Sequence, residues 1–408
     1  MMRFISIFIF ICFFSCAEKN EEIRVPANTT IKLLTKSAQY TAGSEICITF
    51  SASKELLPYL VLKNALGTSV LKPVKDTNQL RFCVPPMYAN KAGIMHWSLV
   101  LNSEEIEAGQ ISIAPDATTT FLETYFGPRQ ITAGKNDFSM LVNIPTDNYD
   151  NTLVNGTMVT VNREFEDEFH QFMVPISKSI AWKNINATEK SGRILVSALC
   201  RNTNSKQLTT IVYPAMPTDF EIGYQRDHTF ADGNQIITLQ TNKILDKYGN
   251  VVSDGTHVNF LIENQDGIFM SATGNTINGR AIARLLHPEE PTTWTAKAFI
   301  TGAARSNTIV VGFKASVEDY PINFDKDQRK LSIGPLLGFM QQKVTDGFSI
   351  QLSIKSEANI INEEEKLFTK DGKAFYILDK NFYPSGTYNI TIEAAGISKE
   401  LLITLPNE

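Results

Sequence analysis

The feature that most constrains this chain is a stretch that occurs twice, 99 residues apart. The first copy reads DNYDNTLVNGTMVTV from Asp147, and the second reads DKYGNVVSDGTHVNF from Asp246. A fixed period of this size is typical of a repeated domain and not of a repeated helix or propeller blade. The sequence therefore predicts at least two copies of a unit of roughly 100 residues.

Both copies of the repeat are predicted to be β-structure. Before the first copy, Phe138, Met140, Val142 and Ile144 alternate with other residues at a spacing of two. The β-branched and apolar run 158–161 follows the turn. Alternation with period two, bounded by Asn, Asp and Gly, is typical of a half-buried strand.

The polar residues between these strands predict a turn that sets the register of a hairpin. Asp and Asn side chains can accept hydrogen bonds from their own backbone at a turn. Asn151, Asn250, Gly156 and Gly255 are the positions that we expect to tolerate a positive φ.

A calcium site is the alternative interpretation of the same turn. Asp147 with Asp150 would supply carboxylate oxygens in the first copy, and Asp246 in the second. Calcium takes six to eight oxygen ligands, and the second copy has Gly249 in the place of Asp150. We therefore favour a structural turn and expect no metal ion or other cofactor.

The second copy belongs to a longer pattern, residues 220–313, that resembles a bacterial Ig-like domain of the invasin and intimin type. The residues that carry the resemblance are Ala231-Asp-Gly233, the turn from Asp246 to Asn250, the strand start Gly255-Thr-His-Val258 and the closing run Trp294-Thr-Ala-Lys-Ala298. Residues 121–212 resemble it less closely, because they carry Asp150 in place of Gly and a long insert at 163–183. Phe121 and Phe220 are also 99 residues apart. The resemblance implies β-sandwiches used as spacers or binding modules, and it implies no catalytic residues.

Proline and polar clusters near 115, 214–217 and 321 divide the chain further. Each segment ends in an apolar strand, a polar connection and another strand, which is typical of the closing hairpin of a sandwich. No convincing amphipathic helix is present. We predict an all-β rod of four tandem Ig-like sandwiches, at residues 28–115, 116–215, 216–315 and 316–408.

The first 15 residues are predicted to be a lipoprotein signal peptide. Arg3 precedes an apolar run, 4–14, that is too short to span a bilayer, and Ser15-Cys16 follows it. A small residue before a cysteine resembles the lipobox of bacterial lipoproteins, which implies acylation of Cys16. The alternative is an ordinary signal peptide that is cleaved nearby.

Residues 16–27 are polar and charged, so we expect a flexible tether. The acidic cluster behind Cys16 resembles the export tag of lipoproteins on the outer face of some outer membranes, and the periplasmic face is the alternative. Removal of residues 1–15 takes away only Arg3 and leaves 37 basic and 43 acidic residues. This balance argues against nucleic acid and against a polybasic membrane patch, so the lipid is the expected membrane contact.

Five cysteines are present, and two of them lie on predicted strands of the first segment. Cys47 and Cys83 each lie on the face opposite the apolar residues of their strand. A disulfide is plausible in an exported protein and would stabilise the fold by roughly 4 kcal/mol on the chain-entropy estimate. Two unrelated thiols are the alternative, and the sequence does not decide between them. Cys200 is expected to be a packed small residue.

Residues 164–173, within 163–183, are the most unusual local stretch, because charged residues alternate with Phe165, Phe169 and Phe172. The interpretation that we favour is a solvated edge strand or a short loop helix. The alternative is a protruding insert that docks on a partner, since exposed aromatic residues mark interfaces. Trp182 is the best candidate for a surface aromatic residue, and a sugar-stacking platform is a further alternative. Trp97 and Trp294 are expected in the core.

The histidines show no zinc spacing, and the sequence contains no nucleophile elbow and no phosphate loop. We therefore expect a protein that is not an enzyme. The favoured function is a lipid-anchored accessory subunit that binds or supports an outer-membrane protein or complex for uptake, secretion, assembly or motility. The alternative is a cell-surface adhesin whose distal domains bind a glycan, a host or a neighbouring cell.

Overall fold

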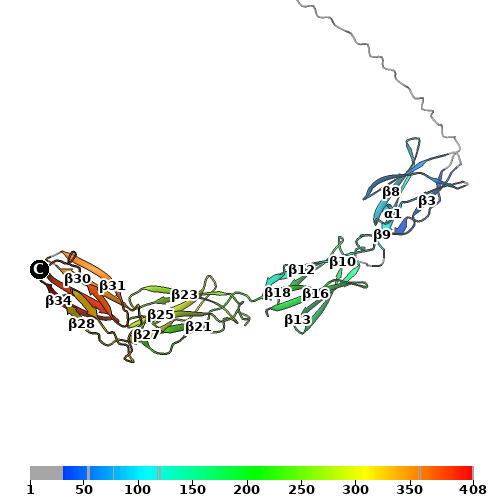
Figure 1. Cartoon of the computed structure of the whole chain (residues 1–408). Coiled ribbons are helices and arrows are strands. Elements are labelled where there is room, and N and C mark those ends of the chain that lie inside the picture. Colours follow the sequence, from blue (N-terminus) through cyan, green and yellow to red (C-terminus); the bar gives the residue numbers. More distant parts are fainter. Residues whose placement is uncertain are drawn as a thin grey trace, which may run out of the picture. The chain divides into compact units, whose positions relative to one another are not determined.

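The structure is a computed structural model, and it describes residues 31–52, 56–76, 78–116, 118, 121–356, 358 and 360–406. The described chain is built from strands, with one short helix, α1 (Pro86–Ala89). Figure 1 shows these strands in chain order. The predicted all-β fold class is confirmed. Among the described residues, no helix has both the length and the apolar content needed to cross a membrane.

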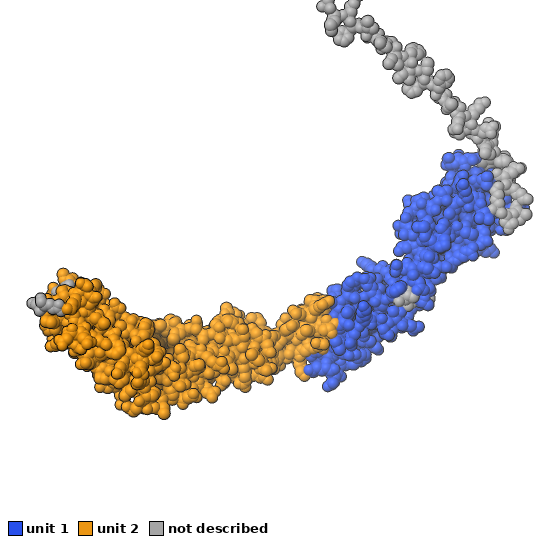
Figure 2. Space-filling view, viewed as in Figure 1, with its two compact units in different colours: residues 1–126, 140–184, 195–208 blue, residues 127–139, 185–194, 209–408 orange. Residues whose placement is uncertain are grey.

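The chain divides into two compact units, which Figure 2 colours separately. Unit 1 comprises Met1–Phe126, Met140–Asn184 and Leu195–Leu208. Unit 2 comprises Gly127–Ser139, Ile185–Ile194 and Thr209–Glu408. The predicted signal peptide, the lipidated Cys16 and the tether lie outside the described residues.

The first stretch of strands forms two sheets. One has the order β1-β3-β7-β6 and the other β2-β9-β8-β4-β5. The strands are β1 (Lys32–Leu33), β2 (Gln39–Thr41), β3 (Cys47–Ser51), β4 (Tyr59–Asn64), β5 (Gly67–Leu71), β6 (Val74–Asp76), β7 (Gln79–Cys83), β8 (Gly93–Leu101) and β9 (Glu104–Ala114). Ile48, Phe50, Phe82 and Trp97 share one core between them. The alternating pattern read from β3 and β7 is therefore confirmed by their burial.

The second stretch contains β10 to β18. Its strands are β10 (Phe121–Gly127), β11 (Gln130–Thr132), β12 (Phe138–Thr146), β13 (Met158–Phe165), β14 (Glu168–Pro175), β15 (Ala181–Asn186), β16 (Gly192–Cys200), β17 (Thr203–Asn204) and β18 (Leu208–Tyr213). The order β10-β12-β15 makes a three-stranded sheet, and β13 pairs with β14 as an antiparallel hairpin. Val159, Ile176, Ala181 and Cys200 belong to its core, so Cys200 is a packed residue as predicted.

The third stretch has two sheets in the orders β19-β21-β24 and β20-β27-β25-β22-β23. Its strands are β19 (Ile222–Gln225), β20 (Phe230–Ala231), β21 (Ile236–Thr241), β22 (His257–Glu263), β23 (Phe269–Asn275), β24 (Ile282–Leu286), β25 (Thr292–Ile300), β26 (Ala304–Arg305) and β27 (Ile309–Ala315). Trp294, Phe260 and Phe313 lie in the core between the sheets.

The fourth stretch repeats this plan with sheets in the orders β28-β29-β32 and β31-β30-β33-β34. Its strands are β28 (Ile322–Asp325), β29 (Lys330–Ile333), β30 (Ser349–Ser356), β31 (Ile361–Phe368), β32 (Ala374–Ile377), β33 (Gly386–Ala394) and β34 (Ile397–Leu405). The Tyr320 hydroxyl is buried in this core and donates to the carbonyl oxygen of Ile392 at 2.9 Å. Burial raises the pKa of Tyr320 to about 12.

The favoured interpretation of the charged and aromatic stretch as a solvated edge strand is confirmed, because β14 lies at the edge of its sheet and most of its side chains are exposed. The description of 163–183 as a long insert is wrong. Residues 158–175 form the β13–β14 hairpin, which has its counterpart in the β22–β23 hairpin of the third stretch. Most side chains of β14 are exposed. Apolar residues, Phe169 and Met173, also lie on its exposed side, so the sequence does not show a clear alternation of polar and apolar positions.

Candidate functional site

The repeated stretch is a turn closed by one aspartate. In the first copy, Asp147 Oδ1 accepts hydrogen bonds from the backbone N–H groups of Tyr149 at 2.8 Å and Asn151 at 2.9 Å. The N–H of Asp147 donates to the carbonyl oxygen of Asn151 at 2.9 Å. A short acidic side chain that accepts two N–H groups of its own loop fixes the turn without a metal ion.

Of the positions predicted to tolerate a positive φ, Gly156 and Gly255 have one, at 87° and 85°, but Asn151 and Asn250 do not, and the left-handed residue comes just before each asparagine. Asp150 has a φ of 57° in the first copy, and Gly249 has a φ of 82° at the equivalent place in the second. Asp is among the few residues other than Gly that adopt this conformation readily. Asn151 and Asn250 follow one position later, and their side chains form hydrogen bonds outside the turn.

The remaining polar atoms of the first turn bind the preceding stretch of strands. Asp147 Oδ2 accepts a hydrogen bond from the N–H of Asp116 at 2.9 Å. Asn151 Nδ2 donates to the carbonyl oxygen of Asn90 at 2.7 Å, and the N–H of Ala92 donates to Asn151 Oδ1 at 2.9 Å. We call these contacts of Asp147 and Asn151 the first clamp.

The second clamp repeats this pattern with Asp246 and Asn250. Asp246 Oδ2 accepts from the N–H of Ala215 at 2.7 Å. Asn250 Nδ2 donates to the carbonyl oxygen of Glu189 at 2.7 Å, and the N–H of Ser191 donates to Asn250 Oδ1 at 2.8 Å. Each copy of the 99-residue repeat therefore forms a turn and also joins its stretch to the preceding one.

Both clamp aspartates are buried and ionised. Burial by itself raises the pKa of Asp147 and of Asp246, but the hydrogen bonds from Asn151 and Asn250 and from backbone N–H groups outweigh it and lower both pKa values. Each carboxylate uses both oxygens as acceptors for N–H groups, so its charge is satisfied within the protein.

A tyrosine completes each clamp. A Cβ added to Gly43 would overlap the ring of Tyr149, and one added to Gly134 would lie 3.1 Å from the hydroxyl oxygen of Tyr248. The two tyrosines are at the same place in the repeat, and each lies against a glycine of the stretch before it.

The junction between the third and fourth stretches lacks the aspartate. Gly338 takes its place, because its N–H donates to the carbonyl oxygen of Gln342 at 2.7 Å as Asp246 does to Asn250. The next residue, Phe339, stacks on Phe230 of the third stretch with 4.1 Å between ring centroids and 10° between planes. This junction therefore adds an aromatic stack to a polar contact, in which the N–H of Ser349 donates to Glu289 Oε2 at 3.1 Å.

A histidine cluster lies beside this aromatic contact. His228, Asp232 and His287 bring atoms that could bind a metal ion within 4.8 Å of one another. However, His228 Nδ1 accepts from the N–H of Phe230 at 3.2 Å, and His287 Nδ1 pairs with the carbonyl oxygen of Phe230 at 2.9 Å. A metal ion bound through either Nδ1 atom would break this pairing. Burial lowers the pKa of His287, which favours the neutral ring.

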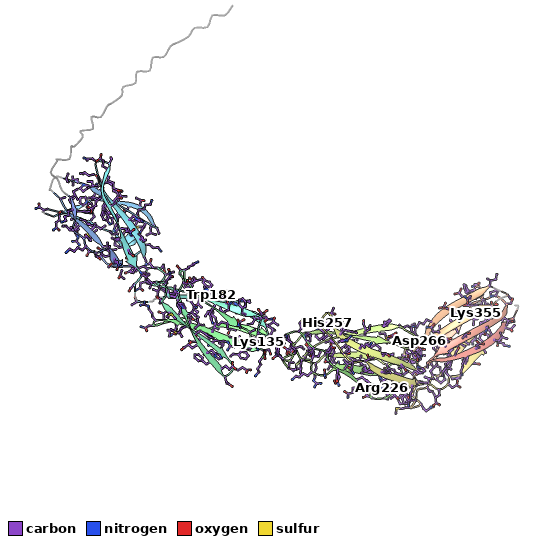
Figure 3. All side chains as sticks on the ribbon, turned by 180° about the vertical axis from the view of Figure 1, so that it is seen from behind. Lys135, Trp182, Arg226, His257, Asp266 and Lys355 are labelled. Atoms are coloured by element: carbon purple, nitrogen blue, oxygen red, sulfur yellow. A yellow bond between two sulfur atoms is a disulfide. The ribbon has the colours of Figure 1, made fainter. Side chains whose placement is uncertain are left out.

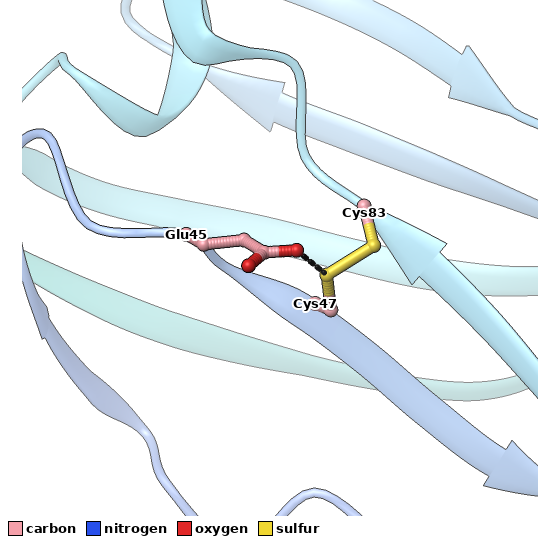
Figure 4. A group of neighbouring side chains, drawn as sticks. All are labelled: Glu45, Cys47 and Cys83. Carbon is pink, nitrogen blue, oxygen red and sulfur yellow. Dashed lines mark hydrogen bonds between the residues drawn. A yellow bond between two sulfur atoms is a disulfide. The ribbon is translucent and has the colours of Figure 1, made fainter.

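Cys47 and Cys83 form a disulfide between the paired strands β3 and β7 (Figure 4). Glu45 Oε1 lies 3.4 Å from Cys47 Sγ and 3.0 Å from Arg81 Nη2. A disulfide sulfur carries no proton, so Cys47 Sγ only contacts the Glu45 carboxylate and donates no hydrogen bond to it. The ion pair with Arg81 holds the Glu45 carboxylate in place.

The predicted partner-binding aromatic residues do not form one surface. Phe165 is a core residue with 4% of its surface exposed, so its prediction as a surface contact is wrong. Phe172 is half-buried, and the Lys183 ammonium lies 4.6 Å above its ring. Phe169 and Trp182 are exposed, but Phe169 is on β14 and Trp182 is on β15 of the other sheet. Figure 3 labels Trp182.

Trp182 instead shares a sheet with two exposed aromatic residues that the sequence analysis did not identify as surface residues. Phe121 and Tyr125 of β10 are 60% and 55% exposed. Phe220, which the repeat pairs with Phe121, is 6% exposed and lies in the core of the third stretch. The available signal was the separation of four residues between Phe121 and Tyr125, since an even separation places both on one face of a strand.

No protein-family model matches the chain, and no curated protein resembles it in sequence. Among solved structures, the Escherichia coli adhesin FdeC is 13% identical, with 70% of this chain and 96% of that chain covered and a TM-score of 0.50. InvD of Yersinia pseudotuberculosis is 11% identical, with 69% and 97% covered and a TM-score of 0.43. Invasin, described as a bacterial integrin-binding protein, is 10% identical, with 92% and 79% covered and a TM-score of 0.45.

The predicted resemblance to invasin- and intimin-type Ig-like domains is confirmed for the fold. This confirmation rests on FdeC, since the TM-scores of InvD and invasin are lower. At 13% sequence identity, the likeness to FdeC concerns the fold alone.

Proposed function

We propose that this protein is a non-catalytic, lipid-anchored surface protein whose four Ig-like domains form an accessory binding module for an outer-membrane protein or complex. The observation that carries the proposal is the pair of clamps. A chain that repeats the same buried Asp–Asn turn at successive junctions bonds each of these domains to the one before it, which suits a scaffold that presents surfaces to a partner.

The membrane anchor in this proposal is the acylated Cys16, and the domains are those at 28–115, 116–215, 216–315 and 316–408. We expect Cys16→Ala to move the protein from the membrane fraction to the soluble fraction. Ser15→Ala keeps a small residue before the cysteine and is the matched control. Unchanged fractionation of Cys16→Ala would exclude the lipid anchor.

The second candidate function is adhesion. FdeC is described as an adhesin, and its fold likeness supports this candidate together with the exposed aromatic residues of the second stretch. In this case the ligand would be a glycan, a host or a neighbouring cell, and the outer-membrane partner would be absent.

The experiment that separates the two candidates is purification of the full-length lipidated protein in mild detergent, followed by mass spectrometry. A stoichiometric outer-membrane protein would support the accessory module. The protein alone, combined with binding of the purified chain to cells, would support adhesion. A protease added to intact cells tests the location of the chain under either candidate function. Cleavage of the chain would establish that it faces the exterior.

A further inference from the structure

Two histidine rings hold the backbone of Phe230 at the junction between the third and fourth stretches. The N–H of Phe230 donates to His228 Nδ1 at 3.2 Å, and the carbonyl oxygen of Phe230 lies 2.9 Å from His287 Nδ1. A carbonyl oxygen can only accept, so His287 Nδ1 carries a proton, whereas His228 Nδ1 accepts and carries none. The hydrogen bond of His228 therefore requires a neutral ring.

His287 is also held in its neutral form, because a second proton would have no acceptor. Its side chain is fully buried, with 5.0 Å between its ring centroid and that of Phe313 and 5.1 Å to that of His228. The other nitrogen, Nε2, has no hydrogen-bond partner among the described residues. A proton added to Nε2 would create a buried charge and a buried donor without an acceptor.

Asp232 is the charged group nearest to both rings. Its carboxylate oxygens lie 3.4 Å from His228 Nε2 and 3.7 Å from His287 Nδ1. Asp232 favours the charged form of His287, while Arg226 opposes it; Asp227 lies directly before His228 in the chain. Burial outweighs the carboxylate and lowers the pKa of His287, so the folded chain favours the neutral ring.

The other elements around the pair contribute groups of a different kind. β27 contributes Lys314, whose backbone pairs with that of Phe230. The segment 288–290 contributes Glu289 and Glu290, and Glu289 Oε2 accepts from the N–H of Ser349 in the fourth stretch at 3.1 Å. Residues 338–342 of the fourth stretch include no titratable side chain. Ordinary carboxyl and amino side chains keep their charge between pH 7.5 and 5.5, whereas histidine does not.

The side chain of Phe230 carries the contact with the fourth stretch. Its ring stacks on Phe339 with 4.1 Å between centroids, and the His228 ring meets Phe339 edge-on at 4.9 Å. A proton on His228 Nδ1 would place a donor against the N–H of Phe230 and break that hydrogen bond. The residue on which Phe339 stacks would then lose part of its support.

The fold does not require a histidine at position 287. Ala187 corresponds to it in the second stretch, because each residue directly follows the third strand of its three-stranded sheet. The first two junctions are closed by Asp147 and Asp246, whose pKa values are lowered, so these carboxylates stay charged in mild acid. The third–fourth junction therefore differs from the other two in its response to pH.

We propose that the third–fourth junction is a pH-sensitive switch, closed near neutral pH by the two neutral rings and opened when acid protonates His228 or His287. The inference goes beyond the proposed function and does not depend on which candidate function is correct. The ordinary pKa of histidine is 6.5, and that of His287 is lower in the folded chain. Its stabilising contribution is therefore complete above about pH 6.5 and is lost as the pH falls below this value.

Hydrogen–deuterium exchange of the full-length protein in detergent with EDTA tests the switch at pH 7.5 and 5.5, after correction for the intrinsic rates. The amides of Phe230 and Ser349 are the reporters, because the first donates to His228 and the second donates across the junction. One histidine that is neutral in the closed state and charged in the open state makes opening roughly tenfold more frequent over this range, and two make it up to roughly a hundredfold more frequent. We expect both amides to exchange faster at pH 5.5 by a factor in this range.

The amide of Ser191 is the matched reporter at the second–third junction. It donates to Asn250 Oδ1 across that junction at 2.8 Å, and no histidine takes part in this clamp. Its corrected exchange rate should be the same at both pH values.

Variants assign the response to the two rings. In His228→Asn the amide oxygen can still accept from Phe230, and in His287→Asn the amide group can still donate to Phe230, but neither side chain titrates. Each variant should lose part of the acceleration, and the double variant should lose all of it. His257→Asn changes an exposed histidine of β22 and should keep the full response (Figure 3). Melting temperatures at pH 7.5 show which variants fold; if His287→Asn does not, His228→Asn alone must still reduce the acceleration by roughly tenfold.

Four outcomes would overturn the proposal. The first is equal corrected exchange of Phe230 and Ser349 at both pH values. The second is acceleration confined to Phe230, which would leave the junction closed. The third is equal acceleration of Ser191, which would reveal a general loosening in acid. The fourth is a full response in folded His228→Asn and in the folded double variant.

Discussion

At the scale of single residues, the clamp aspartates combine two tasks that are usually separate. Asp147 and Asp246 close a local turn with one carboxylate oxygen and hold a residue of the preceding connection with the other. A carboxylate in this position is stabilised in its charged form, because N–H donors surround it on both sides.

Replacement of Asp246 by Asn tests this double role. The amide would place an N–H donor toward the N–H of Ala215 and the Nδ2 group of Asn250. We expect a loss of about 1–3 kcal/mol in the free energy of unfolding at pH 7, since a buried donor is left without an acceptor. Urea denaturation measures this loss, and an unchanged midpoint would contradict it.

The pH dependence of that loss has a definite sign. The pKa of Asp246 is lower in the folded chain than in the unfolded chain, so its contribution is present above the unfolded value near 3.8 and disappears as the pH falls through the lower folded value. The difference in melting temperature between the unaltered chain and Asp246→Asn should therefore shrink as the pH is lowered from 7 to about 3. A difference that stays constant over this range would mean that the carboxylate charge is not involved.

Gly255 carries a second prediction at this scale. Its φ of 85° lies in the left-handed region, where a β-branched residue is strained. Gly255→Val should destabilise the third stretch by about 1–3 kcal/mol. Gly312 has an ordinary φ and open space around its Cβ position, so Gly312→Ala is the control and should melt within a degree or two of the unaltered chain.

At the scale of elements, much of the strand pattern could be predicted, including an exposed edge strand at β14, but the pairing of β13 with β14 as a regular hairpin of the repeat could not. The strands β3 and β7 have one wholly apolar face, and their alternation shows directly in the sequence. In β14, Phe169 and Met173 point outward while Glu168 and His170 lie at the sheet edge. Apolar residues on the exposed face hide the alternation, so the strand resembles an insert.

Deletion of residues 163–183 is expected to unfold the second stretch. The deleted segment contains β14 and residues Val174, Ile176 and Ala181, which pack in or against the core. Circular dichroism and the loss of one cooperative melting transition would report it. A deletion variant that keeps all its transitions would show that β14 is dispensable, as expected of an insert.

The disulfide between β3 and β7 gives a prediction for the first stretch. Cys47 and Cys83 are separated by 36 residues, so their bond should contribute about 4 kcal/mol on the chain-entropy estimate. The double variant Cys47→Ala/Cys83→Ala should lose about this amount in urea denaturation. Dithiothreitol should lower the stability of the unaltered chain and leave the double variant unchanged; equal sensitivity of both would contradict a stabilising bond.

At the scale of the whole molecule, the repeat was visible in the sequence, but its contacts with the preceding stretch of strands were not. The 99-residue period predicted the turn, because Asp, Asn and Gly are local signals. The partners of Asn151 and Asn250 lie 59 to 61 residues earlier in the chain, and they are backbone groups whose identity the sequence does not encode. The aromatic face was missed for a related reason, since Phe121 and Trp182 meet only when β10, β12 and β15 form one sheet.

The clamps predict how the junctions respond to mutation. Asn151→Ala and Asn250→Ala each remove two hydrogen bonds to the preceding stretch and leave most of each turn in place. We expect the double variant to melt within a few degrees of the unaltered chain but to show a broader distribution of dimensions in small-angle X-ray scattering. Gln342→Ala, in the junction that lacks the aspartate, is the control. An unchanged distribution of dimensions would show that the aspartates and tyrosines of the clamps hold the junctions without the asparagine side chains.

The disulfide of the first stretch also has a mechanical consequence. If a cell attached through this protein is pulled away from its surroundings, the load runs along the backbone from one domain to the next. Cys47 and Cys83 are 36 positions apart in the sequence. The covalent bond between them carries the load, so the residues between them do not. About 120 Å of chain, at ~3.4 Å per extended residue, is thereby withheld from stretching. A chain linked in this way releases less length when it is stretched, because the strands between Cys47 and Cys83 carry no load while the bond holds.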